Sequence, residues 1–480
     1  MGFNSPKKRE RELRPFSNQT QSSQVPVKKR RIGVSFFFSP IVILLNFSLT
    51  VHFFGLSTPN QVVFDELRVG KQVNSYCCLK ERVFDLQPPL APMLLSLTAW
   101  LSGYDGTVIF TRVGQDYDQS SWRFRWFPAL LGSLIPILFF LVLRQLGATR
   151  PIAFLGGMAL ALENSMILQS KLLAGDSLLW FLFWGGLWLF LKAVRKKERR
   201  MLWIAGVGVV SGLCLATHFT GVVLFALVSF ILFRPFLRKR DKVTFLFGAK
   251  PVAMIAVFGL ITYLSVWAIH FSVLSNPGLG DRYFIPKGNL MEAIVGVHEE
   301  IYQVAGKVNE AHPAAHPWYG WALMRKPIFY WSGGNRVIYL WGNPIVWMGT
   351  TLLFLFVMGY YALSKVTTLG VLINPQKPKS AVWVMGWATF ITLLPWAAFG
   401  GAQFINHYFL TLTCAMGAVL LWLDQADWVE SSRIRKQGAS YFLVGALIVI
   451  GFLLVSPITY GLEAPEWYLR ILIEWVRSFR

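Results

Sequence analysis

Two adjacent carboxylates, Asp65 and Glu66, follow the first apolar run of the chain, in the segment VVFDELRVGKQ. A second polar segment, FDLQPPLAP, comes soon after and contains Asp85 and Gln87. Carboxylates at a membrane face are costly to keep there and usually mark a functional site. Such a carboxylate can act as a general base that takes a proton from an incoming hydroxyl. We therefore interpret Asp65 as a candidate base.

Other polar residues gather near the expected outer ends of apolar segments. They are Arg125, Glu163, Asn164, Gln169, Lys171, Asp176, His218, Asn406, His407 and Tyr408. A cation such as Arg125 can hold a phosphate leaving group and stabilise its developing charge. The alternative is that these residues pair to hold helices together, as Lys171 could with Asp176 or Glu163. Their concentration at one face favours a site, because helix contacts of this kind can lie at any depth.

The composition excludes an ordinary soluble protein. The 480 residues are 54% hydrophobic and 15% charged, with a mean hydropathy of +0.48. A soluble domain keeps about a quarter of its residues charged. We therefore predict an all-α polytopic membrane protein. Residues 1–33 form a basic cytoplasmic tail that we expect to be disordered, residues 34–460 a membrane catalytic domain, and residues 461–480 an outer C-terminal tail.

About eleven apolar segments are long enough to be membrane spans, which need about 20 residues each. They lie near residues 34–54, 126–147, 151–167, 173–193, 201–217, 219–236, 250–271, 345–364, 381–399, 404–423 and 440–460. The net charge of +22 is concentrated in the tail and in alternate loops, as expected for cytoplasmic segments. This distribution places the N-terminus in the cytoplasm and the C-terminus outside, and it argues against nucleic-acid binding.

Two long outer loops, residues 55–125 and 272–344, are expected to form a cavity at the outer membrane surface. The first contains the apolar stretch Leu90–Leu101, which is too short to span and predicts a re-entrant or amphipathic helix. The second contains His316 and Trp318 in AHPAAHPWYGW, which we interpret as a loop that contacts an acceptor. Prolines beside both histidines of this motif disfavour a regular helix, so no metal site is predicted.

An ordered set of motifs covers most of residues 60–425: FDELRVGKQ, FDLQPPLAPMLLSLTAWLSGYDG, RWFPALLGSL, LENSMILQSKLLAGDSLL, HPWYGWALMRKPIFYW, YLWGNPIVW and INHYFL. In this order, the motifs resemble those of the protein O-mannosyltransferase family. The chain departs from the family pattern at five positions. Gln87 and Asn406 stand where the family has histidines, Lys171 replaces an arginine, Glu163 replaces an aspartate, and His218 replaces a lysine. The second outer loop has no room for a β-trefoil MIR domain, so the chain resembles the short, mostly prokaryotic members.

The resemblance implies a C-type glycosyltransferase architecture and transfer of mannose from a polyprenyl or dolichyl phosphate to Ser/Thr hydroxyls of secretory polypeptides, with inversion. Asp65 would be the base, and Glu66 would position the acceptor or the base. The implied contacts of the donor phosphate are Arg125, His407 and Lys171. The implied supporting residues are Asp85, Gln87, Glu163, Asn164, Asp176 and Tyr408. No cofactor is expected besides the lipid-linked sugar, which is a co-substrate.

Three alternatives stay open on the sequence alone. A related C-type transferase would use a lipid or glycan acceptor, a degenerate member would serve as a non-catalytic partner subunit, and a transporter would perform no chemistry. A transporter predicts functional charge near the middle of the membrane, whereas this chain carries it near the outer face.

We expect the lipid bilayer, the donor and an acceptor polypeptide as partners, and leave open a homo- or heterodimer. A prokaryotic plasma membrane is the expected location, with the endoplasmic reticulum as the alternative.

Overall fold

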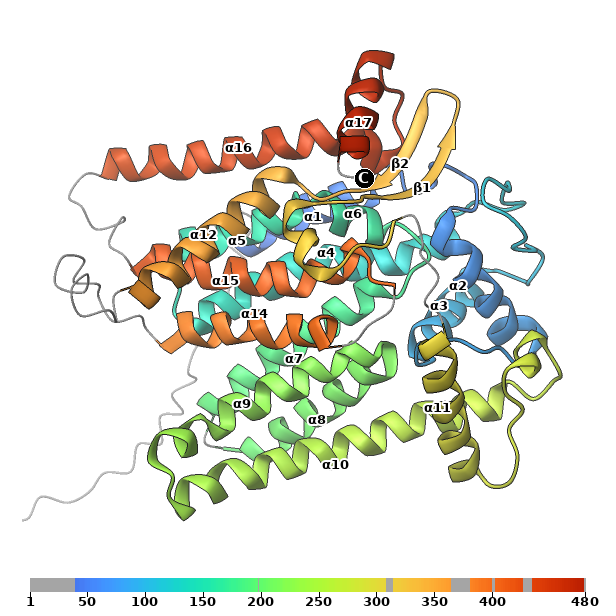
Figure 1. Ribbon diagram of the computed structural model, residues 1–480, viewed down its shortest axis with the longest axis horizontal. Helices are drawn as coiled ribbons and strands as arrows, with labels where there is room; N and C mark the ends of the chain where they lie inside the picture. Colours follow the sequence, from blue (N-terminus) through green and yellow to red (C-terminus); the bar gives the residue numbers. More distant parts are fainter. Residues whose placement is uncertain are drawn as a thin grey trace, which may run out of the picture.

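The computed structural model describes residues 39–196, 198–307, 314–363, 380–398, 402–425 and 434–478. The predicted basic tail, residues 1–33, lies outside the described residues. Most of the described chain forms long helices that run side by side across the molecule (Figure 1).

Within the described ranges, nine helices are long and apolar enough to cross a membrane, counting the 3-10 turns that lead into two of them. They are α4 (Trp122–Leu146), α7 (Asp176–Arg195), α8 (Arg200–Thr217), α9 (Val222–Lys239), α10 (Lys242–Val273), α12 (Pro344–Leu363), α14 (Ser380–Ala398), α15 (Phe409–Gln425) and α16 (Ile434–Tyr460). A tenth span is the pair α5 (Arg150–Ala161) and α6 (Asn164–Ser170), which meet at a bend of 57°. The polytopic helical fold is thus confirmed.

The predicted span at 151–167 is a broken helix because Glu163 begins a new one. Its backbone is extended, and its side chain accepts hydrogen bonds from the amides of Ser165 and Met166. An N-cap of this kind satisfies amide groups that have no partner within the helix. The predicted first span corresponds to α1 (Pro40–Phe53), whose 14 residues begin after the Ser39 cap. Residues 34–38 of that prediction are not described.

The core lies where α4, α7 and α15 meet. Phe139 and Trp184 contact edge to face with ring centroids 4.9 Å apart, and Trp180 stacks on Phe409 at 4.0 Å. All four side chains are buried, as expected for an aromatic core packed by offset and edge contacts. These helices form the rigid frame from which the outer segments project.

Segments assigned to the outer loops gather at one end of the helical bundle, at the right of Figure 1. They are α2 (Phe64–Asn74), α3 (Leu90–Leu101), α11 (Leu290–Lys307) and the strands β1 (Ile328–Gly333) and β2 (Arg336–Leu340). The helix α3 has the bounds expected from the sequence. The predicted outer tail contains a further helix, α17 (Glu466–Ser478), at the same end.

The strands β1 and β2 form an antiparallel hairpin that the all-α prediction did not include. Its turn passes through Gly333 and Gly334, and Gly334 has a φ of +59°, a conformation that glycine adopts without strain. The register pairs Phe329 with Tyr339 and Trp331 with Ile338, so Tyr330 is an extra residue on β1. Such a β-bulge re-aims a side chain and is common next to active sites.

Candidate active site

The two adjacent carboxylates on α2 have different surroundings. Glu66 is fully buried and accepts hydrogen bonds from Nε and Nη2 of Arg125, at 2.7 and 2.8 Å. The Tyr117 hydroxyl and the Leu173 amide also donate to Glu66. Glu66 is therefore the partner of a buried arginine, in a bidentate geometry that is favourable for such pairs.

Arg125 has a full set of partners inside the chain. Its side chain is 1% exposed. Besides Glu66, it donates to the carbonyls of Leu56, Pro59 and Gln61 and to Ser121 Oγ. The donor-phosphate contact predicted for Arg125 does not agree with this geometry, because a phosphate would have to displace Glu66 or a backbone carbonyl. Arg125 instead fixes the start of α4 against the chain that leads into α2.

Asp65 faces a different set of residues and is only partly buried. Its Oδ2 accepts a hydrogen bond from the Tyr330 hydroxyl at 2.7 Å and from Gln169 Nε2 at 3.3 Å. Gln169 Nε2 also donates to Asp176 Oδ2 at 2.8 Å, and Asn406 Nδ2 donates to Asp176 Oδ1 at 3.3 Å. One connected network thus joins the predicted base to Asp176, which lines a cavity.

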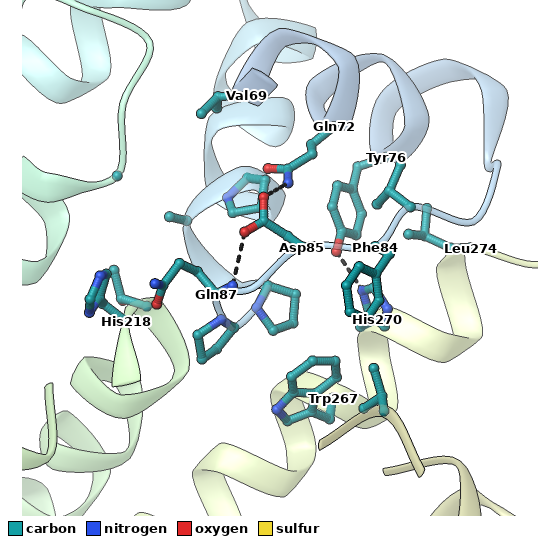
Figure 2. A pocket seen from close by; sticks show the side chains of 18 of the residues that line it. Val69, Gln72, Tyr76, Phe84, Asp85, Gln87, His218, Trp267, His270 and Leu274 are labelled. Atoms are coloured by element: carbon teal, nitrogen blue, oxygen red, sulfur yellow. Dashed lines mark hydrogen bonds between the residues drawn. The ribbon is translucent and has the colours of Figure 1, made fainter. Parts of the chain in front are cut away.

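The cavity is open to solvent, and the empty space within and in front of it is about 970 Å³. Asp85 organises its polar side, where it accepts hydrogen bonds from Gln72 and from the Gln87 amide (Figure 2). It also accepts a hydrogen bond from Arg68. Near Asp85, the Tyr76 hydroxyl and Nδ1 of His270 are hydrogen-bonded at 2.6 Å (Figure 2). Apolar walls come from Leu179, Trp267, Phe271, Leu274, Phe284 and Val297. The cavity is therefore lined by charged side chains on one part of its wall and by apolar side chains on another.

Arg68 is a cation that the sequence analysis did not single out. Asp85 raises the pKa of Arg68, with smaller contributions from Asp65 and Asp176. Its side chain is 59% exposed and lines the cavity. A permanent positive charge thus lies among three carboxylates, on the same helix as Asp65 and three residues further along.

The residues near the start of α15 have different surroundings, since some lie close to the cavity and others are packed in the core. His407 stacks on Trp396 with ring centroids 3.8 Å apart, and its Nδ1 accepts from the Phe404 amide. His218, which lines the cavity, lies 6.2 Å from His407 between ring centroids. Tyr408 contacts Thr351 through its hydroxyl at 3.3 Å and is buried. Asn406 is the member of this segment that joins the Asp65 network.

Gln87, which stands in place of a family histidine, lies beside His218 at the cavity wall (Figure 2). Its Oε1 accepts a hydrogen bond from the Phe219 amide at 3.4 Å, at the turn between α8 and α9. This contact joins the first outer loop to the membrane helices.

Lys171 does not pair with Asp176 or Glu163, as one alternative suggested. Its Nζ is buried, has no hydrogen-bond partner among the described residues, and lies 4.1 Å from the ring centroid of Tyr460. A cation–π contact accounts for part of the stabilisation of this charge. The donor contact predicted for Lys171 stays a prediction.

Glu163 and Asn164 lie within the helical bundle and have structural partners. Glu163 Oε1 accepts from the Asn343 amide and from Trp347 Nε1, at 3.0 and 2.8 Å. Asn164 Nδ2 donates to Thr459 Oγ1 at 2.9 Å, which fastens α6 to α16. Both residues hold the broken span in place, and neither has a hydrogen bond to Asp65 among the contacts of the described residues.

The predicted acceptor loop contacts the segment that precedes α15. The His316 amide donates to the Gln403 carbonyl at 2.9 Å, and the Trp318 amide donates to Gln403 Oε1 at 3.0 Å. Trp321, from the same loop, lies 5.9 Å from His407 between ring centroids. This loop therefore packs beside the His407 segment, and its role in acceptor binding stays a prediction.

Two family models match this chain in succession. One, described as dolichyl-phosphate-mannose-protein mannosyltransferase, matches residues 42–275, and the other, the C-terminal four TMM region of protein-O-mannosyltransferase, matches residues 290–478. The chain belongs to the protein O-mannosyltransferase family. Protein O-mannosyl-transferase 2 of Danio rerio is 30% identical to it over 286 residues, which are 56% of this chain and 36% of the relative. This mannosyltransferase-family chain thus spans about a third of that relative's length.

The fold of this family member agrees with solved structures. A chain of the S. cerevisiae protein O-mannosyltransferase Pmt1-Pmt2 complex superimposes with a TM-score of 0.81 and 16% identity over 92% of both chains. ArnT from Cupriavidus metallidurans matches with a TM-score of 0.54 and 14% identity, over 92% of this chain and 69% of ArnT. These likenesses confirm the C-type glycosyltransferase architecture predicted from the sequence.

Proposed function

We propose that this protein transfers mannose from a polyprenyl or dolichyl phosphate to Ser/Thr hydroxyls of secreted or membrane proteins. Family membership supports the reaction. The assignment of residues is supported by the network of Asp65, Gln169 and Asp176, which connects a partly buried carboxylate to a residue that lines a cavity with a cation and apolar walls.

In the proposed reaction, Asp65 takes the proton of the acceptor hydroxyl while the hydroxyl oxygen attacks the anomeric carbon of the mannose. The bond between that carbon and the phosphate oxygen breaks on the opposite side, so the configuration inverts. The lipid phosphate leaves with both electrons of the broken bond. General-base assistance of this kind contributes roughly a hundredfold to ten-thousandfold in rate.

The phosphate needs cations near the cavity. Arg68 fits this role, because it lines the cavity and its side chain is 59% exposed. Arg82 also lines the cavity, but its guanidinium is bonded to both oxygens of Asp281. Lys171 and His407 stay proposed donor contacts, and Arg125 supports the site through Glu66. The apolar cavity residues, among them Trp267 and Phe271, suit the first isoprene units of the donor. An arginine beside apolar walls matches the charge and the tail of such a lipid.

The test is transfer by the purified full-length protein in lipid nanodiscs, with labelled polyprenyl phosphate mannose and a Ser/Thr-rich peptide. We expect label on the peptide for the wild type and for Asp118→Asn, which changes an exposed aspartate of the same outer loop. We expect its loss in Asp65→Asn. Label that enters lipid or glycan but never the peptide would establish the alternative transferase. Undiminished turnover in Asp65→Asn would overturn the assignment of the base.

We further propose that the protein acts as a dimer, homomeric or heteromeric, in the plasma membrane of a prokaryote, with the endoplasmic reticulum as the alternative. The proposed dimer is supported by the likeness to a chain from a Pmt1-Pmt2 complex. Cross-linking in native membranes followed by mass measurement tests the assembly. Fractionation of the source cell tests the location.

A further inference from the structure

We propose that Tyr330 is a positioning residue for Asp65, and that its hydroxyl changes hydrogen-bond partner from Asp65 to Gln169 when Asp65 takes up a proton. This inference rests on the proposed function, because it assigns Asp65 the role of base. It adds a hydrogen bond that holds the Asp65 side chain in place both before and after proton transfer.

The hairpin β1–β2 positions Tyr330 next to Asp65, although the two residues are 265 positions apart in the sequence. Tyr330 is the extra residue of the β-bulge, and its side chain is 1% exposed. Its ring contacts Phe64 edge to face, with centroids 6.2 Å apart, directly beside Asp65 in the sequence. Burial and this ring contact hold the hydroxyl in one place, 2.7 Å from Asp65 Oδ2.

The hydroxyl of Tyr330 has two acceptors but only one hydrogen. Gln169 Oε1 lies 2.9 Å from it, nearly as close as Asp65 Oδ2. While Asp65 is ionised, the hydroxyl donates to the carboxylate, which is the stronger acceptor. Once Asp65 is protonated on Oδ2, the new O–H donates to the Tyr330 oxygen, and the tyrosine hydrogen turns to Gln169. Both states are thus satisfied by a change in hydrogen positions at Tyr330, whose own heavy atoms stay in place.

The orientation of the Gln169 amide follows from its other contacts. Its Nε2 donates to Asp176 Oδ2 at 2.8 Å and to Asp65 Oδ2 at 3.3 Å, and both partners are carboxylates. A flipped amide would turn its oxygen toward two carboxylates, which accept and do not donate when ionised. The Oε1 atom must therefore face Tyr330, as the partner change requires.

The same contacts assign the two oxygens of Asp65. Among the described residues, Oδ2 has two donors, whereas Oδ1 has no hydrogen-bond partner inside the chain. Oδ1 is thus the atom offered to the acceptor hydroxyl, and the proton received there reaches Oδ2 by exchange with solvent or by rotation of the carboxyl group. Burial, with the nearby Asp65 charge, raises the pKa of Tyr330 well above its ordinary value, so Tyr330 stays a neutral donor.

The experiment compares wild type with Tyr330→Phe, which removes only the hydroxyl, and with Tyr302→Phe as the control, since Tyr302 is 82% exposed on α11. We expect kcat of Tyr330→Phe to fall roughly tenfold to a hundredfold, in line with the loss of one hydrogen bond to a charged group. The KM for the lipid donor should change by less than about twofold, because Tyr330 bonds the base and not the cavity cation.

The pH dependence distinguishes positioning from mere packing. Without the donated hydrogen bond the ionised carboxylate is less stabilised, so protonation becomes easier. The acidic limb of the pH profile of kcat should therefore move to higher pH in Tyr330→Phe and stay in place in Tyr302→Phe. A kcat and a pH profile identical to wild type would overturn the inference while Asp65→Asn still reports on the proposed function.

A stability measurement tests the contact even if no transfer is found. The apparent melting temperatures of wild type, Asp65→Asn, Tyr330→Phe and the double variant form a thermodynamic cycle. The inference predicts non-additive shifts, because Tyr330→Phe removes a hydrogen bond that Asp65→Asn already weakens by removing the charge of its acceptor. Additive shifts would overturn it. Absence of transfer by the wild type, together with non-additive shifts, would reject the proposed function and retain the contact.

Discussion

Glu66 and Arg125, which are 59 residues apart in the sequence, form a bidentate ion pair that is almost completely excluded from solvent. The neighbouring Asp65 contacts Gln169 and Tyr330 instead. Successive residues of an α-helix point about 100° apart, so α2 sends the two carboxylates in different directions. Glu66 therefore holds the outer loop to the helical bundle, whereas Asp65 is free of that ion pair and can serve as the proposed base.

Glu66→Gln should unfold at a distinctly lower temperature than wild type. The substitution leaves the buried Arg125 charge without its counter-ion, and loss of one partner of a buried pair costs about 3–5 kcal/mol. The measurement is thermal unfolding in detergent, with Glu299→Gln as the control because Glu299 is exposed on α11. A melting temperature equal to that of the control would show that the pair does not support the fold.

Lys171→Met should raise the melting temperature and weaken donor binding. The buried Nζ has no hydrogen-bond partner among the described residues, so removing its charge removes a desolvation cost of a few kcal/mol at most. If Lys171 contacts the donor phosphate, as predicted, the KM for the lipid donor rises. Lower stability with an unchanged KM would instead show that Lys171 serves only to pack on Tyr460.

Arg68→Gln should raise the KM for the lipid donor by about tenfold, the effect of one hydrogen bond to a charged group near solvent. The change removes the cation that Asp85 holds at the cavity. Arg123→Gln is the matched control, because Arg123 lies in the same outer loop, is not among the residues that line the cavity, and donates only to the Gly103 carbonyl in the contacts described. Steady-state kinetics with varied donor measures both, and an equal KM in the two variants would exclude Arg68 as a donor contact.

Asp281→Asn should lower the melting temperature at neutral pH and have no effect in strong acid. The Arg82 guanidinium bonds both oxygens of Asp281, at 2.6 and 2.9 Å, and holds the pKa of that carboxyl below its usual value. A depressed pKa stabilises the folded state above the unfolded value of about 4 and loses that effect as the pH falls below it. Melting curves from pH 7 to pH 3 test this, and a difference that does not shrink as the pH falls below about 4 would contradict it.

The spans were predictable because each is a local apolar run, and their order agrees with the helices of the structure. The positions of Asp65, Asp85 and Asp176 near one cavity followed from the assignment of the loops to one membrane face. The contact between Asp65 and Tyr330 was not predictable, because it joins residues 265 apart through a hairpin. The signal for that hairpin, two glycines between two short runs of β-branched and aromatic residues in IFYWSGGNRVIYL, is present in the sequence.

Arg125 shows a different limit of prediction from sequence, namely that the partner of a charged side chain cannot be derived from its position. Its position at the outer start of a span fits a phosphate ligand and a structural ion pair equally well. Only the packing of α2 against α4 decides between them, because it determines which groups surround the guanidinium. Charge and depth in the membrane can be derived from a sequence, whereas the partner of a charge depends on tertiary structure.

Gly461, at the exit of α16, supports the hairpin from behind. It has a φ of +61°, and a Cβ atom there would lie 3.1 Å from Ile338 on β2. Just beyond it, Arg336 pairs with Glu463, and the Ala464 amide donates to the Asn335 carbonyl. The end of the last span therefore supports the strand pair that carries Tyr330. A bulky substitution at this turn would displace the hairpin and with it the hydroxyl that contacts Asp65, almost four hundred residues earlier in the chain.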